Sequence, residues 1–378
     1  MLKNIFNKDK RGKTGGRKPQ TQPAPGAGAV PGNVSPAQPS GAPTQQPMQM
    51  AAAAPQGSPA PNGMRVISSV PQSPVREIRV PEPSVTKFDL SGLPVYVIGL
   101  DQLTPLSSRG VPEVCVNIHM HGRTGSARHE LHLAKELWTY TMQEREAAKQ
   151  RSRVRDFLIV CFDSRNHGER TTAPNAQKSW KEGNSTHAVD MYGMIRGTAV
   201  DTTFILEMLA PYMFPNDERI VSIYTVTGKS LGGHSSWQVL AHEPRIKVGV
   251  SLIGTPDFQK LIAMRAKKSG LEDKPPVVPN ALRKLMQAED PAETPYREPN
   301  ASNPFFGKKI CACNGEDDTL VRYSYSEEFY NHVLVGPPGS QDQRDGFMVF
   351  LQPSTGHKVT SPMLQVGAHW LGMWAIPY

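Results

Sequence analysis

The residues best placed to do chemistry lie in the run Gly228-Lys229-Ser230-Leu231-Gly232. The β-branched residues of 220–226 before this run predict a strand, and residues 233–240 after it predict a helix. A serine at such a turn has a strained backbone, and side chains at Gly228 and Gly232 would collide with the neighbouring backbone. The turn lifts the Ser230 hydroxyl to a helix N-terminus, where negative charge is stabilised. Ser230 is therefore the candidate nucleophile.

A serine nucleophile needs a base, and position in the predicted fold selects one of the eleven histidines. His357 lies between a predicted strand at 347–352 and a helix at 362–374, on the same rim of the sheet as Ser230. An acid that orients the imidazole is expected at this rim too. The loop after the predicted strand 308–313 offers Asp317 and Asp318. The chain order is thus serine, aspartate, histidine.

Two further loops follow predicted strands and contain polar residues. The loop after the strand at 114–120 contains His121-Gly122-Arg123, which is either an ordinary turn or a set of backbone donors for a developing oxyanion. The loop after the strand at 157–162 reads Asp163-Ser164-Arg165-Asn166-His167-Gly168.

These four motifs, in this order, resemble the α/β-hydrolase superfamily over roughly residues 90–378. The acid loop of that family often reads G-x-x-D-x-x-V. The spacing of Gly315, Asp318 and Val321 fits this pattern and favours Asp318 over Asp317. The run at 165–170 is similar to that of the dienelactone-hydrolase and prolyl-oligopeptidase-like esterases.

The resemblance implies a role for each motif. The backbone N–H groups of Leu231 and Arg123 would form the oxyanion hole, with His121 and Gly122 supporting the loop. Arg165 and His167 would brace the neighbouring loop by hydrogen bonds.

The activity that the resemblance implies is hydrolysis of a small-molecule carboxylic ester or thioester through an acyl-enzyme, without a cofactor. One alternative is a serine peptidase of the prolyl-oligopeptidase type, although residues 1–90 cannot build the large propeller of that class. The other alternative is a non-catalytic binding protein with the same fold, because fold alone does not define function.

The remaining pattern predicts an α/β fold with a mostly parallel sheet flanked by helices. Further strands are expected at 65–70, 75–80, 94–100, 220–227 and 248–253, and helices at 126–150, 188–210 and 323–334. The proline-containing segment 258–306, with helices expected at 258–268 and 280–288, is either a lid over Ser230 or a surface excursion.

Residues 1–63 predict a disordered arm ahead of a hydrolase domain at 64–378. The arm is basic over 1–19 and rich in Pro, Ala and Gln from about 20 to 63, so it cannot bury enough apolar surface to fold. Residues 1–76 contain nine Lys and Arg against one Asp, which equals the whole net charge of +8. No nucleic-acid partner is therefore expected for the domain. The arm is a passive linker or a docking segment for a partner.

Composition also indicates the state of the cysteines, the absence of a metal site or membrane span, and the expected location. Four cysteines in apolar runs are expected to be free buried thiols, and no metal site is expected because no ligands occur at zinc spacing. No apolar stretch approaches the length of a membrane span, so stable membrane insertion is not expected. The expected location is the cytoplasm, with mitochondria as the alternative because the N-terminus is basic and poor in acids.

Overall fold

The computed structural model describes residues 61–71, 78–106 and 110–378. Almost all of the arm predicted at 1–63 lies outside these residues, so its disorder stays a prediction. The described part contains a nine-stranded sheet in the order β1-β9-β8-β7-β6-β4-β5-β3-β2. The strands are β1 (Arg65–Ile67), β2 (Val85–Leu90), β3 (Leu93–Ile98), β4 (Glu113–Met120), β5 (Asp156–Phe162), β6 (Ile220–Lys229), β7 (Ile246–Leu252), β8 (Lys309–Gly315) and β9 (Phe347–Gln352).

All strand pairs from β1 through to β5 are parallel, and only the pairs β5–β3 and β3–β2 at one edge are antiparallel, so β3 alone runs against the other strands. The prediction of a mostly parallel sheet is confirmed. Every residue of β5 is buried, because helices cover both faces of the sheet. In a parallel sheet the carboxyl ends of the strands share one edge, so the loops that follow β4, β6, β8 and β9 gather at that edge.

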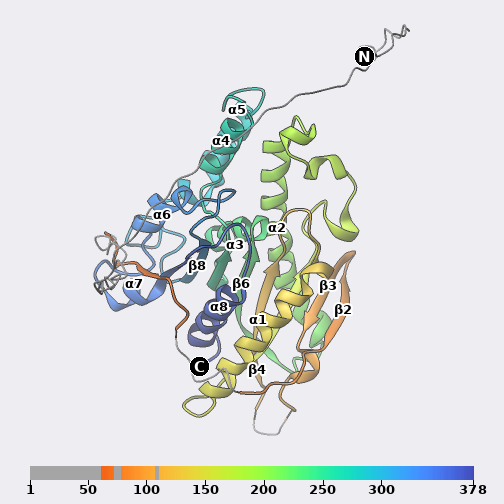
Figure 1. The fold of residues 1–378 in the computed structure, drawn as a ribbon. Coiled ribbons are helices and arrows are strands. Elements are labelled where there is room, and N and C mark those ends of the chain that lie inside the picture. Colours follow the sequence, from red (N-terminus) through yellow and green to blue (C-terminus); the bar gives the residue numbers. More distant parts are fainter. Residues whose placement is uncertain (1–60, 72–77, 107–109) are drawn as a thin grey trace, which may run out of the picture. The chain divides into compact units, whose positions relative to one another are not determined.

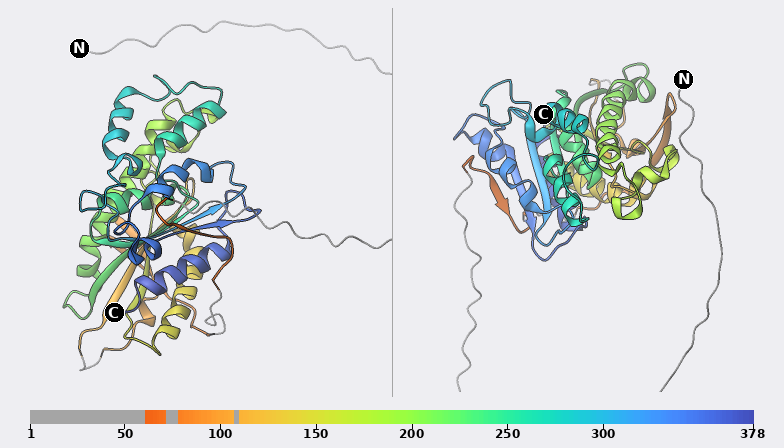
Figure 2. Two further views of the ribbon diagram at one scale, coloured as in Figure 1. Left: turned by 90° about the vertical axis from the view of Figure 1, so that its left-hand side faces the viewer. Right: turned by 90° about the horizontal axis from the view of Figure 1, so that it is seen from above.

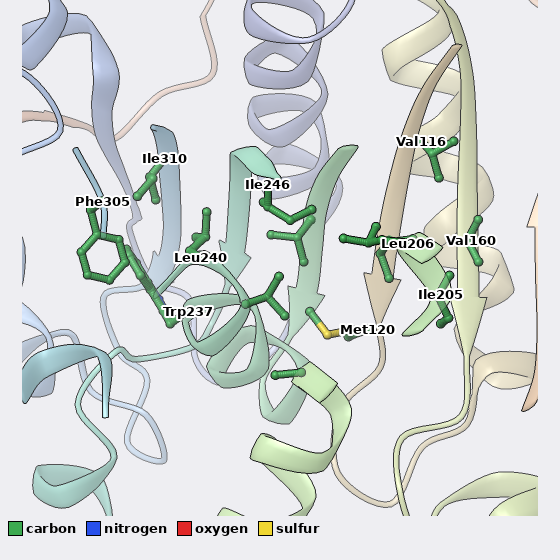
Figure 3. Packing of buried hydrophobic residues seen from close by; sticks show 14 of the residues in the cluster. Val116, Met120, Val160, Ile205, Leu206, Trp237, Leu240, Ile246, Phe305 and Ile310 are labelled. Atoms are coloured by element: carbon green, nitrogen blue, oxygen red, sulfur yellow. The ribbon is translucent and has the colours of Figure 1, made fainter. Parts of the chain in front are cut away.

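Helices form a layer on each face of the sheet (Figures 1 and 2). On one face, α1 (Ala127–Ala148) and α8 (Ser361–Trp374) pack side by side. On the other face lie α2 (His187–Met213), α3 (Leu231–His242) and the short α6 (Glu327–His332). Figure 3 shows the core of this second face, where Trp237 of α3 and Leu206 of α2 meet apolar residues of the strands.

The remaining helices are short or lie in the segment after β7. They are α4 (Phe258–Lys268), α5 (Asn280–Glu289) and α7 (Gln341–Gly346), with 3₁₀ turns η2 (Leu100–Gln102), η3 (Gly168–Arg170), η4 (Pro174–Gln177), η5 (Trp180–Glu182), η6 (Pro291–Glu293) and η7 (Tyr323–Tyr325). The apolar sides of α4 and α5 pack against the first turns of α2 and against Leu231. The segment 258–306 therefore has its own core contacts. A lid function for it stays a prediction.

Several predicted boundaries were wrong. Of the strand predicted at 75–80, residues 75–77 lie outside the described residues, and 78–80 form no regular structure. Strand β2 was not predicted, because it is an edge strand with largely exposed residues. The single helix predicted at 323–334 is instead η7 followed by α6, with a break at Ser326. The four cysteines are buried free thiols, as predicted.

Candidate active site

Ser230 occupies the turn between β6 and α3, with φ 53° and ψ −109°. These angles are rare for a residue with a side chain and store strain of about 1–3 kcal/mol. A Cβ at Gly228 would lie 2.2 Å from the carbonyl oxygen of Gly232, and a Cβ at Gly232 would lie 2.2 Å from that of Met120. The turn is therefore tight enough that neither glycine can be replaced without moving backbone.

The Ser230 hydroxyl is connected to a carboxylate through one imidazole. Ser230 Oγ lies 2.8 Å from His357 Nε2, and His357 Nδ1 lies 2.7 Å from Asp318 Oδ2. A carboxylate can only accept, so the neutral imidazole has its proton on Nδ1 and its lone pair on Nε2 facing the hydroxyl. The structure thus brings together the three residues that the sequence indicated, from loops after β6, β8 and β9.

Asp318 is fixed from its other side as well. Its Oδ1 accepts the backbone N–H groups of Leu320 at 2.8 Å and Val321 at 2.9 Å, and the residue is buried. Asp317, the alternative acid, is exposed. A Cβ at Gly315 would lie 2.3 Å from the carbonyl oxygen of Thr355, so the loops that carry the acid and the histidine pass very close to each other.

The loop after β4 lies directly beside the nucleophile. A Cβ at Gly122 would lie 3.6 Å from the Cβ of Ser230. The N–H of Gly232 donates to the carbonyl of His121 at 3.1 Å, which ties the first turn of α3 to this loop. Leu231 is the first residue of α3, where N–H groups have no partner within the helix. Within the described residues, the backbone N–H of Arg123 has no acceptor either.

His121 connects this loop to the loop after β5. Its Nδ1–H donates to the carbonyl of Gly122 at 2.7 Å, and its Nε2 accepts the N–H of Ser164 at 3.0 Å. Burial lowers the pKa of His121 to about 4, so the ring is neutral at pH 7. A neutral ring can donate at one nitrogen and accept at the other, which this pair of contacts requires.

Arg165 and His167 lie in the loop after β5 and hold it to its surroundings. Arg165 pairs with Asp201 of α2 at 3.1 Å, and His167 Nδ1 lies 2.9 Å from the carbonyl oxygen of Arg165. Asp163, at the start of the loop, accepts the N–H groups of Ala127 at 2.7 Å and Glu169 at 2.8 Å. These contacts are structural, and none of them reaches Ser230.

Sequence reasoning missed an ion pair next to the nucleophile. Lys229 Nζ lies 2.6 Å from Glu130 Oε2, and the Glu130 side chain is buried. Burial alone would raise the pKa of Glu130, but His119 and the ammonium group of Lys229 outweigh it and lower this pKa to about 2. The sequence did contain a signal that Glu130 is buried. Ala127, Glu130 and Ala134 repeat at helical spacing along the buried side of α1.

A pocket of about 400 Å³ opens at Ser230. Its walls come from the loop after β4, α1, the turn at Ser230 and the segment that follows β9. The side chains of Arg123, Lys229 and Lys358 make the lining basic, while Leu133 and Val359 supply apolar surface. In the described part of the chain, no group of three or more His, Cys, Asp or Glu residues could hold a metal ion.

The sheet order and the connection of β6 to α3 through the strained Ser230 define an α/β-hydrolase fold, and the fold predicted from the sequence motifs is confirmed. No protein-family model matches the sequence, and no curated protein matches it either.

Among solved structures, the chain is similar to TT1662 from Thermus thermophilus at 22% identity and a TM-score of 0.53, over 77% of this chain and 98% of that one. It is also similar to the esterase Pf2001 of Pyrococcus furiosus at 16% identity and a TM-score of 0.42, over 78% of this chain and 93% of that one. The match to the acylaminoacyl peptidase of Pyrococcus horikoshii, at 14% identity and a TM-score of 0.42, covers 78% of this chain and 41% of that one. At 22% identity the likeness to TT1662 shows the fold alone. None of the helices in the described ranges has the length and apolar character needed to cross a membrane.

Proposed function

We propose that this chain is a serine hydrolase that cleaves a carboxylic ester or thioester through an acyl-enzyme at Ser230. The observation that carries the proposal is the pair of contacts at His357, 2.8 Å to the Ser230 hydroxyl and 2.7 Å to the Asp318 carboxylate. Hydrogen-bond distances on both sides of one imidazole are the arrangement that activates a serine nucleophile.

In the first half of the reaction, Ser230 Oγ attacks the ester carbonyl while His357 Nε2 takes its proton. The imidazolium that forms is stabilised by the Asp318 carboxylate, whose oxygens accept two backbone N–H groups and the imidazole N–H. The imidazolium then returns the proton to the departing alkoxide or thiolate, which leaves as an alcohol or thiol. Ser230 keeps the acyl group.

The oxyanion of the tetrahedral intermediate needs donors that are in place before the reaction. The backbone N–H groups of Leu231 and Arg123 are proposed for this role, because they flank Ser230 and have no competing acceptor in the described residues. Each such donor lowers the barrier by about 3 kcal/mol in comparable sites. The hydrogen bond from the Gly232 N–H to the His121 carbonyl connects the two segments that carry these donors and so fixes the donors relative to each other.

In the second half, water replaces the alcohol. His357 takes a proton from the water, the hydroxyl attacks the acyl carbon, and the imidazolium returns the proton to Ser230 Oγ as the free acid leaves. The same machinery would accept an amide, so a peptidase remains an outcome of the test. A binding protein would need none of these contacts.

The test compares the full chain with Ser230→Ala on p-nitrophenyl butyrate and on a short p-nitroanilide peptide. We expect ester hydrolysis by the wild type and its loss in Ser230→Ala. Ser235→Ala is the matched control, because its hydroxyl, one turn further along α3, donates only to backbone carbonyls. Hydrolysis of the anilide but not of the ester would identify a peptidase, and ester hydrolysis by Ser230→Ala would refute the proposal.

A further inference from the structure

Two arginines, one in the pocket at Ser230 and one on the helix α4 that packs against Leu231, lack the partners that arginines elsewhere in the domain have. Arg265 of α4 and Arg123 of the loop after β4 are half-buried, and neither forms an ion pair with a described residue. The other arginines of the described part that are not exposed all pair with carboxylates; they are Arg145, Arg155, Arg170, Arg196, Arg219 and Arg283. A charge taken out of water without a partner destabilises a fold.

The described residues around Arg265 provide few hydrogen-bond acceptors for its guanidinium group. Its Nη1 contacts the thioether sulfur of Met191 at 2.8 Å, which is a weak acceptor, and its buried Nε–H has no acceptor in the described residues. Burial, and to a smaller extent the positive charge of Arg123, lower the pKa of Arg265 to about 10. Arg265 still carries its charge at pH 7.

Two neutral side chains of this region, His234 and Trp180, also have buried nitrogen atoms without a partner among the described residues. His234 Nδ1 lies 3.0 Å from the backbone nitrogen of Thr255 and 3.2 Å from its carbonyl oxygen, while its Nε2 is buried and has no partner among the described residues. The indole N–H of Trp180 is likewise buried without an acceptor, and the Trp180 ring packs on His187 at 4.9 Å. Burial and the charge of Arg265 lower the pKa of both His187, to about 4, and His234, to about 3. Both rings are therefore neutral at pH 7.

The nearby carboxylates are already committed to other groups. Both oxygens of Asp318 accept hydrogen bonds, from His357 and from two backbone N–H groups. Glu182, whose pKa is lowered mainly by its bonds to Ser179 and also by the charge of Arg123, accepts the Ser179 hydroxyl at 2.6 Å and N–H at 2.9 Å. Neither acid forms an ion pair with Arg265 or Arg123.

This cluster lies next to the chemistry. Arg123 lines the pocket at Ser230, its Nη1 donates to the carbonyl of Gln177 at 2.5 Å, and it forms no ion pair with a described residue. The buried side of α4 packs with Leu231 and Val321, the residues that follow the nucleophile and the acid loop. The helix that carries Arg265 therefore packs directly behind the residues that follow the nucleophile and the acid, and Arg123 lies in the pocket itself.

We propose that Arg265 and Arg123 form a subsite for a carboxylate on the substrate, so that the preferred esters carry a second, ionised acid group. A guanidinium fork matches the two oxygens of a carboxylate, and the bound anion would supply the missing counter-charge. This inference rests on the proposed function, because it names the substrate class of that same site.

The test uses two matched pairs of esters with the full chain. Monoethyl glutarate is compared with ethyl valerate, and butyryloxyacetate with ethyl butyrate, so that the carboxylate lies on the acyl side in one pair and on the alcohol side in the other. Hydrolysis is followed by pH-stat at pH 7.5. In one of the two pairs, we expect kcat/KM for the anionic ester to exceed that of its neutral partner at least about tenfold. A factor of this size corresponds to the free energy of one hydrogen bond to a charged group.

Arg265→Met keeps the apolar bulk of the side chain and removes the charge, and it should lower this ratio about 10- to 100-fold. Lys267→Met is the control, because Lys267 is an exposed cation on the same helix, and it should leave the ratio unchanged. Arg123→Gln, which keeps the backbone N–H, serves as the second variant if Arg265→Met does not fold. A wild-type ratio near one in both pairs, or an unchanged ratio in a folded arginine variant, would overturn the inference.

A binding measurement separates this inference from the proposed function. Calorimetry with Ser230→Ala should show glutarate binding at least about tenfold tighter than valerate, and Arg265→Met in the same background should remove the difference. Equal binding of the two acids would overturn the subsite even if esters are hydrolysed. Tighter binding of glutarate would support it even if no ester is turned over, which would count against the proposed function alone.

Discussion

Replacing Asp318 by asparagine tests how the structure sets the protonation of His357. Asp318 Oδ1 accepts two backbone N–H groups, and Oδ2 faces His357 Nδ1. In Asp318→Asn the amide oxygen will keep the two N–H bonds, which contribute about 1 kcal/mol each. The amide NH₂ must then face His357, so the imidazole has to accept at Nδ1 and bear its proton on Nε2.

An imidazole with its proton on Nε2 presents a donor to Ser230 and cannot take the hydroxyl proton. The corresponding substitution in the serine protease template lowers kcat about 10⁴-fold through the same change of tautomer, which equals about 5.5 kcal/mol of barrier. We expect a loss of this size here, because the 2.7 Å contact and the double anchoring of Oδ1 leave the amide no alternative orientation.

The assay is p-nitrophenyl butyrate hydrolysis, with thermal melting to show that the variant folds. Asp317→Asn is the matched control, since Asp317 is exposed and neighbours Asp318 in the chain, and it should keep at least half of wild-type kcat. If folded Asp318→Asn retains more than a tenth of wild-type kcat, or if Asp317→Asn loses as much, the assignment of the acid is wrong.

Three other changes have expected outcomes. Gly232→Ala places a methyl group 2.2 Å from the carbonyl oxygen of Met120, so it should lower the free energy of unfolding by at least about 2 kcal/mol. Urea titration measures this loss. Gly193→Ala is the control, because Gly193 lies on an open helix surface and its replacement should not destabilise the fold. Burial lowers the pKa of Lys308 to about 7, so the unfolded chain binds more protons between pH 7 and 10.5. The free energy of unfolding of the wild type should therefore rise with pH by up to about 1.4 kcal/mol per unit relative to Lys308→Met, and parallel curves would contradict this. A chain that lacks residues 1–56 should keep wild-type kcat/KM on p-nitrophenyl butyrate, and a large drop would show that the arm contributes to the enzyme.

The parts that were predictable from the sequence depend on signals that are local in the chain. The glycines around Ser230 and the apolar runs of β4, β6 and β8 define the turn and the parallel strands directly. Loops that follow parallel strands must share one edge, so the loops of Asp318 and His357 could be placed beside Ser230 before their distances were known.

The missed features depend on contacts between distant residues. Lys229 pairs with Glu130 across 99 positions, and the helical spacing that places Glu130 on the buried side of α1 does not identify its partner. Arg265 stands in the basic run Arg265-Ala266-Lys267-Lys268, which is typical of an exposed helix end, and only the packing of α4 against α2 encloses it. Strand β2 was missed because Lys87 and Asp89 lie on an open sheet edge, where the apolar pattern weakens.

The most direct test of the central claim is covalent labelling of the full chain with a fluorophosphonate probe, followed by peptide mapping. The account predicts a single labelled tryptic peptide, 230–245, with fragment ions that place the adduct on Ser230 and not on Ser235 or Ser236. Ser230→Ala should not be labelled. An adduct on another residue, or a folded wild-type protein that does not react while a known serine esterase in the same tube does, would contradict it.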